Sequence, residues 1–217
     1  MKVFDIAKRL KIIIKHRAFL IGIIRSSLFF LENPEKSVWG SITEADEEGI
    51  RHAVAYASNY EGPIVEIGAC FGHTTNLLAS LKRLDVTLIT VEGFYWNPFY
   101  LPKDIHRQFL KRTIRCAIVH CATQIFEGDI EAFYSANVML KPSLVFIDAT
   151  HYYESVRRDI DWALSTGCPV ISGHDYMDMH PGVIKAVHES FGDNISVYGS
   201  VWVHIDPKAE HGSKSTS

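Results

Sequence analysis

The chain has 217 residues, 47% of them hydrophobic and 22% charged, an ordinary composition for a globular protein with one sizeable domain and an appendage. Its net charge of −3 conceals an asymmetry, because residues 1–31 carry an excess of Lys and Arg and leave the remainder of the chain acidic. An acidic main domain argues against nucleic acid as a substrate.

Residues 1–40 are predicted to form a basic, apolar, helical extension. The longest apolar stretch, residues 18–31, is too short for a membrane span and is interrupted by Arg25. No small-residue cleavage site follows it, so a signal peptide is not expected either. Two interpretations stay open: a helix that packs on its own domain or on a partner subunit of a homo-oligomer, or a peripheral membrane helix drawn to anionic lipid through residues 1–31.

The main domain is predicted over residues 41–206. Ser41 and Glu44 have the spacing of a capping box, which predicts a helix over 42–59. Strands and helices then alternate along the chain. The predicted strands are 63–68, 86–92, 116–121, 143–148 and 169–173. The predicted helices are 73–83, 103–114, 128–136, 152–165 and 181–191.

Two terminal runs, 194–198 and 200–205, are joined through Gly199 and predict an antiparallel hairpin. Residues 207–217 are polar and predict a flexible tail. Alternating strands and helices favour an α/β, Rossmann-like, doubly wound fold. We therefore expect a mostly parallel seven-stranded sheet with an antiparallel C-terminal edge hairpin and an N-terminal helical extension.

The segment PIVEIGACFGHTT, residues 63–75, reads as a buried strand, a glycine turn and the start of a helix. A helix N-terminus at a strand's carboxyl end is suited to an anionic group. Glu92 ends the next strand, where an acid accepts hydrogen bonds from ribose hydroxyls. Together they predict an adenosine-bearing cofactor. Cys70 and His73 stand where a dinucleotide fingerprint needs glycine, so NAD and FAD are disfavoured.

Glu66 followed by Gly68 and Gly72 resembles motif I of the class I S-adenosylmethionine-dependent methyltransferases, although many members carry glycine where Cys70 stands. In that family the glycine turn cradles the amino acid end of the cofactor. The resemblance implies S-adenosylmethionine as the cofactor. The cofactor-binding residues it implies are Glu66, Gly68, Cys70, Gly72, His73, Thr74, Glu92 and Gly93.

Polar side chains end two further strands. Asp148 follows residues 143–147, and His174 with Asp175 follows residues 169–173. Because ligands bind at the carboxyl ends of parallel strands, we expect these side chains and His151 to converge. An acid at the end of an apolar strand is costly unless it has a partner or a role.

The segments FIDATHYYE, GHDY and PGVIKAV resemble the small-molecule and sugar O-methyltransferases of class I, type 24. The departures are Ala149 for the usual glycine and Cys168-Pro169 in a glycine turn. By position, related enzymes imply a divalent metal held by Asp148 and Asp175, with His174 as a third ligand. Oxygen ligands suit Mg²⁺, whereas a histidine ligand shifts the preference toward a transition metal.

The same resemblance makes His151 the general base for an attacking hydroxyl, alongside Asp148 as a catalytic residue, because neutral imidazole accepts a proton near pH 7. Alternatives stay open: the acids contact cofactor or acceptor directly, His174 is structural, and His151 only leads the helix 152–165. His180 is expected to be a solvated loop residue. The aromatic segment 93–101 either flanks the adenine, covers the acceptor or packs on its own domain.

The sequence thus predicts an S-adenosylmethionine-dependent methyltransferase that acts on a hydroxyl of a small molecule or sugar. The four cysteines form no C-x-x-C pair, so we expect reduced thiols and a cytoplasmic protein, peripheral to the membrane if residues 1–31 bind lipid. The alternatives are an NAD-dependent Rossmann oxidoreductase and an inactive scaffold that binds the cofactor.

Overall fold

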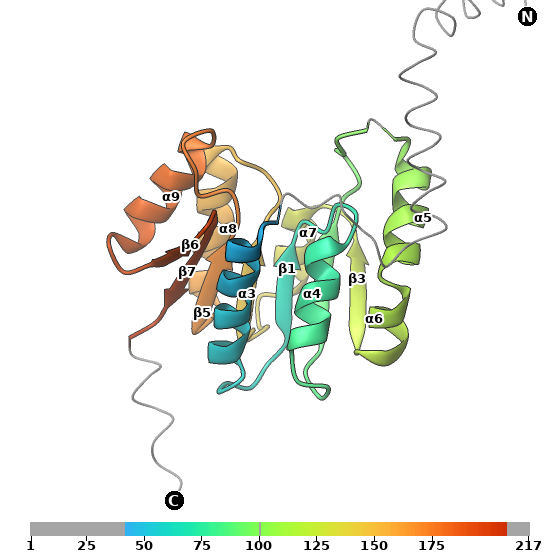
Figure 1. The fold of residues 1–217 in the computed structure, drawn as a ribbon, viewed down its shortest axis with the longest axis horizontal. Coiled ribbons are helices and arrows are strands. Elements are labelled where there is room, and N and C mark those ends of the chain that lie inside the picture. Colours follow the sequence, from blue (N-terminus) through green and yellow to red (C-terminus); the bar gives the residue numbers. More distant parts are fainter. Residues whose placement is uncertain (1–41, 100, 208–217) are drawn as a thin grey trace, which may run out of the picture.

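The computed structural model describes residues 42–99 and 101–207, which form one seven-stranded sheet with helices on both faces (Figure 1). The extension predicted for residues 1–40, its subunit or membrane contact, and the predicted tail beyond residue 207 lie outside the described residues. Over the described ranges, no helix has the length and apolar character needed to cross a bilayer.

The strand order is β3-β2-β1-β4-β5-β7-β6. The parallel strands are β1 (Ile64–Ile67), β2 (Leu88–Glu92), β3 (Thr123–Glu127), β4 (Leu144–Ile147) and β5 (Val170–Gly173). The antiparallel edge is formed by β6 (Ser196–Tyr198) and β7 (Val201–Ile205). The predicted Rossmann-like fold with an antiparallel edge hairpin is confirmed. Strands β1 and β4 are parallel neighbours, so their carboxyl ends lie together, and the strand order reverses between them.

Helices bury apolar residues against both faces of the sheet (Figure 1). One face is covered by α3 (Glu44–Ala57), α4 (His73–Leu81), α5 (Lys103–Thr113) and α6 (Arg115–His120). The other is covered by α7 (Ile130–Ala136), α8 (Tyr153–Ser165) and α9 (Pro181–Phe191). Strands β1, β4 and β5 are buried along their whole length, as expected of parallel strands covered on both faces.

The strand predicted at 116–121 is wrong, because this segment is the helix α6 and the third strand is β3 at Thr123–Glu127. The apolar run around Ile118 and Val119 suggested a buried strand, but both side chains are exposed. The segment instead continues helically from α5, with the amide of Ile118 bonded to the Ile114 carbonyl. A short apolar run does not distinguish helix from strand, and β3, as a parallel-edge strand, is only partly buried.

The capping box of α3 lies two residues later than predicted. Thr43 is the N-cap, its hydroxyl accepts from the Asp46 amide, and the Asp46 carboxylate accepts from the Thr43 amide. Asp46 is almost completely buried, so this cap is also a core residue. Its other carboxylate oxygen, Oδ1, accepts hydrogen bonds from the amide and hydroxyl of Ser200, just before β7.

Candidate active site

The turn after β1 brings the backbone close to the exit of β4. Gly68 has a φ of 95°, and a Cβ there would lie 2.3 Å from the Asp148 carbonyl oxygen. Gly72 is the N-cap of α4 with a φ of 85°, and a Cβ there would lie 2.4 Å from Ile114 Cγ2. Both positions therefore require glycine, for conformation and for space.

Glu92 ties this turn to the exit of β2. Its Oε2 accepts hydrogen bonds from the amides of Ala69 at 3.1 Å and Cys70 at 2.8 Å, and its Oε1 accepts from the Phe94 amide at 2.6 Å. A carboxylate has about four lone-pair sites, so three are used by the backbone. Capacity for one more donor is left, and the ribose-binding role of Glu92 stays a prediction.

A cavity of about 190 Å³ opens between the exits of β1, β2 and β4. Four of the predicted cofactor residues line it: Gly68, Cys70, Glu92 and Gly93. Asp148, Ala149 and Thr150 also line it. The cavity lies where doubly wound folds bind their ligands.

The other predicted cofactor residues lie outside this lining. Glu66 is completely buried on β1 and accepts a hydrogen bond of 2.6 Å from the Thr75 hydroxyl, so it supports the turn from below. Thr74 is buried in the first turn of α4, behind the N-cap Gly72, and His73 begins that helix. Burial raises the pKa of Glu66 to about 8, against the hydrogen bonds that it accepts, so the buried carboxyl is held largely protonated at neutral pH.

Cys70 occupies a left-handed conformation with a φ of 46°. This explains why glycine is common at this position of the resembled motif, since left-handed backbone is costly for residues with a Cβ. The side chain packs against the cluster formed by Phe71 and Phe109. Burial and the neighbouring carboxylates of Glu92 and Asp148 raise the pKa of the Cys70 thiol to about 12, which makes it a packing residue rather than a nucleophile.

The cavity residues on α7 and α8 and just before α7 were missed by the sequence analysis: Asp129, Ile130, Glu131 and Arg158. Asp129 follows β3 and caps α7, with Oδ1 accepting from the Glu131 amide at 2.8 Å. The signal was an acid directly after the third strand. It was overlooked because that strand was placed at 116–121.

Arg158 projects from α8 to the rim of the cavity, held by its partners on both sides. It donates to Oδ1 of the buried Asp159 at 3.1 Å and to Oε1 of Glu131 at 2.9 Å. Tyr134 donates to the same Asp159 oxygen at 2.8 Å. This network fixes the α7–α8 side of the cavity.

Tyr95 and Trp96 of the predicted aromatic segment also line the cavity, and both are largely exposed. The neighbouring Phe94 is buried, with its ring edge-on to His106 at 5.2 Å. The segment thus divides into a buried anchor and two exposed rings at the cavity rim. The rings can close over a bound molecule, whereas Phe94 holds the base of the loop.

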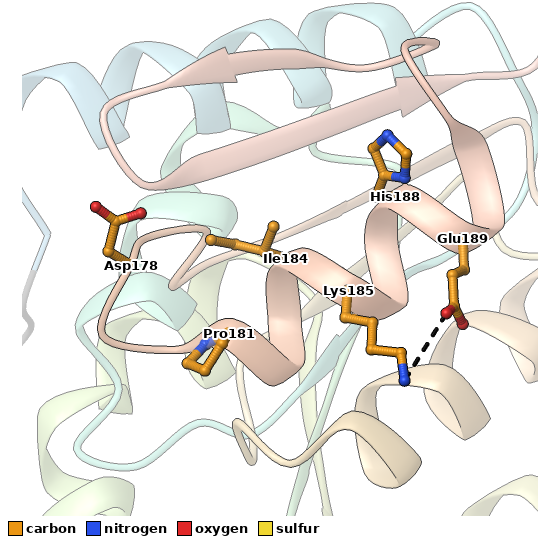
Figure 2. Close-up of a pocket in the computed structure, with 6 residues that line it drawn as sticks. All are labelled: Asp178, Pro181, Ile184, Lys185, His188 and Glu189. Carbon is orange, nitrogen blue, oxygen red and sulfur yellow. Dashed lines mark ion pairs between the residues drawn. The ribbon is translucent and has the colours of Figure 1, made fainter.

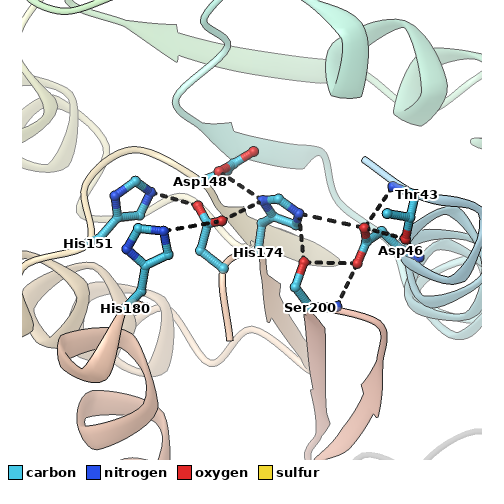
Figure 3. A network of polar contacts seen from close by, with 8 residues as sticks. Thr43, Asp46, Asp148, His151, His174, His180 and Ser200 are labelled. Atoms are coloured by element: carbon cyan, nitrogen blue, oxygen red, sulfur yellow. Dashed lines mark hydrogen bonds and ion pairs between the residues drawn. The ribbon is translucent and has the colours of Figure 1, made fainter. Parts of the chain in front are cut away.

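At the exits of β4 and β5 the structure brings together Asp148, His151, His174 and Asp175 (Figure 3). His151 Nε2 lies 2.6 Å from Asp175 Oδ2, and the His151 side chain is 41% exposed, so the imidazole is accessible. His180, expected to be solvated loop polarity, instead packs its ring on that of His151 with centroids 4.0 Å apart. Its Nε2 is 3.8 Å from Asp175 Oδ1.

His174 is buried and is held from behind by a contact that the sequence did not indicate. Its Nε2 lies 2.9 Å from the Ser200 hydroxyl, which in turn lies 2.9 Å from Asp46 Oδ1 (Figure 3). The carboxylate can only accept, so Ser200 donates its proton to Asp46 and accepts from His174. The network therefore assigns a proton to Nε2 of His174.

The opposite nitrogen, Nδ1 of His174, faces two carboxylates. It lies 3.3 Å from Asp175 Oδ1 and 3.7 Å from Asp148 Oδ1, without an aligned hydrogen bond to any described residue. Ligand atoms of these three residues lie within 4.8 Å of one another. Two carboxylate oxygens and an imidazole nitrogen form a donor set that fits a divalent cation.

The charges of this cluster are coupled. Burial disfavours charged His174, but the carboxylates of Asp148 and Asp175 outweigh it and raise the pKa of His174 to about 10. Burial likewise opposes ionisation of Asp175, yet the hydrogen bond with His151 and the close contact with His174 hold its pKa well below the usual range. The hydrogen bond to Asp175 raises the pKa of His151. In the metal-free protein, a proton on His174 thus balances the two acids.

A second hollow, about 380 Å³, lies along the outer surface of α9 (Figure 2). Its lining residues are Asp178, Pro181, Ile184, Lys185, His188 and Glu189. It contains none of the predicted site residues, and its Lys185 and Glu189 form an ordinary i,i+4 surface pair. We therefore place the candidate active site at the sheet edge.

The chain matches a family model described as a methyltransferase domain over residues 65–176. The matched region runs from β1 through the turn after β5, so it contains the glycine turn, Glu92, Asp148 and Asp175. Among proteins with curated functions, none matches the sequence significantly.

Solved structures share the fold. An O-methyltransferase from Bacillus cereus in complex with SAH is 15% identical with a TM-score of 0.59, over 83% of this chain and 91% of that chain. A putative O-methyltransferase from Klebsiella pneumoniae is 19% identical with a TM-score of 0.57, over 82% and 87%. A TDP-rhamnose 3'-O-methyltransferase of calicheamicin biosynthesis is 13% identical with a TM-score of 0.57, over 84% and 92%. At these identities the likeness establishes the fold alone.

Proposed function

The chain belongs to the methyltransferase-domain family, whose class I members use S-adenosylmethionine, and we propose that it transfers the methyl group to a hydroxyl oxygen of a small molecule or sugar. The family assignment replaces the alternative of an NAD-dependent oxidoreductase. The observation that supports a hydroxyl as the methyl acceptor is the His151–Asp175 pair beside the cofactor cavity.

His151 acts as the general base in this proposal. Asp175 accepts the proton of Nε2, which leaves Nδ1 as the nitrogen with a free lone pair. Methyl transfer to a hydroxyl requires loss of the hydroxyl proton as the oxygen attacks the sulfonium methyl, and Nδ1 receives that proton. Asp175 keeps the ring in this tautomer and stabilises the imidazolium that forms.

The cofactor would be held by the turn after β1 and by the exits of β2 and β3. Glu92 offers its remaining acceptor site to a ribose hydroxyl, and Asp129 offers Oδ2 to the exocyclic amine of adenine. Trp96 and Tyr95 present aromatic faces beside them. The methionine end then lies toward Gly68 and Asp148.

A divalent cation fits between Asp148, Asp175 and Nδ1 of His174, and we propose Mg²⁺ as the first candidate. The support is the orientation of the ring: Ser200 keeps a proton on Nε2 of His174, so Nδ1, which lies between two carboxylates, is the nitrogen whose proton a cation would displace. When bound, a cation there would lower the pKa of the acceptor hydroxyl and assist the base. The chain's own residues orient the acceptor whether or not the cation is present.

Two measurements on the full chain test the proposal. Calorimetry is expected to detect S-adenosylmethionine binding but no NAD binding. Methyl transfer from labelled S-adenosylmethionine to a panel of phenols, catechols and nucleotide sugars is then followed for the wild type and for His151→Gln. Loss of methyl transfer in His151→Gln with retained cofactor binding supports His151 as the general base. Cofactor binding without transfer to any acceptor would instead support an inactive scaffold.

A further inference from the structure

The loop between β5 and α9 places a third imidazole at the edge of the site. Asp175 has a φ of 61°, and the chain then folds back so that the His180 amide donates to the Met177 carbonyl at 2.8 Å. Gly182 allows the start of α9 to approach the loop that carries His151, because a Cβ there would lie 2.5 Å from the His151 carbonyl oxygen. The fold thus holds His180 against His151 with a close backbone contact.

Donor atoms of three residues converge at this point. His151 Nε2 is 2.6 Å from one oxygen of Asp175, and His180 Nε2 is 3.8 Å from the other. All the ligand atoms lie within 4.8 Å of one another. Bonds of about 2.05 Å to a tetrahedral ion place ligand atoms about 3.3 Å apart, so shifts below 1 Å would complete the coordination.

We propose that His151, Asp175 and His180 form a second cation site, selective for a first-row transition metal, and that a metal bound there takes His151 away from proton transfer. Two imidazole nitrogens and one carboxylate favour Zn²⁺, Co²⁺ or Ni²⁺ over Mg²⁺, which prefers oxygen ligands. The site differs from the one between Asp148, Asp175 and His174 in its histidines and shares only Asp175. It is also open to solvent, with His151 41% and His180 23% exposed.

The inhibitory consequence follows from the tautomer and rests on the proposed function of His151. A metal on Nε2 displaces the proton that Nε2 shares with Asp175, and a neutral imidazole bound through Nε2 carries its proton on Nδ1. Nδ1 then cannot accept the proton of the acceptor hydroxyl. Zn²⁺ would therefore inhibit methyl transfer by occupying the base, while Mg²⁺ at its own site would not.

The test uses the full chain with Co²⁺ and Zn²⁺ as probes. We expect the wild type to show the visible absorption of bound Co²⁺. His180→Ala should bind Co²⁺ at least tenfold more weakly. The matched variant His188→Ala, at an exposed position of α9, should bind Co²⁺ with the wild-type affinity. In long-range ¹H–¹⁵N spectra of the wild type, Zn²⁺ is expected to shift the ring nitrogens of His151 and His180. Equal Co²⁺ affinity in His180→Ala, or Zn²⁺ shifts confined to His174, would overturn the site.

A second arm measures activity. With the rate of each protein normalised to its own rate without added metal, Zn²⁺ is expected to inhibit methyl transfer by the wild type at least tenfold more strongly than by His180→Ala. If metal binds at this site but inhibits both proteins equally, the inhibitory role is wrong. If no acceptor is methylated at all, the proposed function fails, while the absorption and NMR results still decide the metal site. Should His180→Ala not fold, the wild-type spectra alone decide it.

Discussion

The Ser200 hydroxyl lies 2.9 Å from Nε2 of His174, and this contact determines which imidazole nitrogen faces the sheet edge. Ser200 is itself fixed by Asp46, which accepts from both its amide and its hydroxyl. The start of α3 therefore orients a side chain at the end of β5. Without this pair, the buried ring could turn over and present Nε2 instead of Nδ1 to the two acids.

Ser200→Ala removes the acceptor for Nε2 and one of the donors to Asp46. We expect it to reduce divalent-metal affinity about 10- to 100-fold and the free energy of unfolding by about 1–3 kcal/mol, because the buried groups lose a partner. Calorimetric titration with Mn²⁺ and urea unfolding measure the two effects. Ser190→Ala on α9, whose hydroxyl only bonds the helix backbone, is the matched control. Unchanged metal affinity would argue against the role of Ser200 in orienting His174 for a metal.

Asp175→Asn keeps the shape of the side chain but removes the charge that stabilises imidazolium at His151. We expect kcat to fall about 10²- to 10⁴-fold, while the Kd for S-adenosylmethionine changes by less than about threefold. Single-turnover methyl transfer and calorimetry separate the two quantities. Asp178→Asn, at an exposed position of the same loop, is expected to leave both unchanged. A parallel loss of cofactor affinity would assign Asp175 to binding instead.

Glu66 makes stability depend on pH. Its folded pKa of about 8 lies above the ordinary value of 4.5 for a glutamate, so between these values the folded chain binds the additional proton. This contribution to stability is fully present below pH 4.5 and is lost as the pH rises through 8. We expect Glu66→Gln to reduce the change of the urea midpoint with pH over this window, and to be more stable than the wild type at pH 8.5.

The control for this measurement is Glu48→Gln on the exposed side of α3, which should leave the pH profile unchanged. Gln retains an acceptor for the Thr75 hydroxyl, so the comparison isolates the charge. If the wild type and Glu66→Gln lose stability equally from pH 4.5 to 8, the buried carboxyl is not responsible.

Asp129 has two separable roles, as the N-cap of α7 and as a cavity residue. Asp129→Ser keeps a capping oxygen but loses the carboxylate. We expect it to weaken the binding of S-adenosylmethionine about 10- to 100-fold, with little loss of stability. Asp129→Ala loses both and should also cost about 1 kcal/mol of unfolding free energy. Cofactor titrations and thermal unfolding of both variants distinguish the roles, and equal cofactor affinity in the wild type and Asp129→Ser would limit Asp129 to capping.

Most of the fold could be predicted because its signals are local. The buried strands β1, β4 and β5 are short β-branched runs, and glycines mark the turn after β1. The third strand was misplaced because Arg115–His120 and Thr123–Glu127 are both short and only partly apolar. What distinguishes them is packing: Ala117 fits the helical layer, and residues 123–127 pair with β2. That error also concealed Asp129.

The sequence by itself determined which side chains reach the sheet edge, because a residue that ends a parallel strand must lie there: Asp148, His174 and Asp175 follow from this rule. Only the tertiary structure decided which partners they meet. Asp46 and Ser200 are 154 positions apart and meet because α3 packs across β5 and β7. His180 meets His151 because Gly182 lets α9 approach. Such contacts depend on the relative placement of elements distant in the chain, and no local pattern of residues records it.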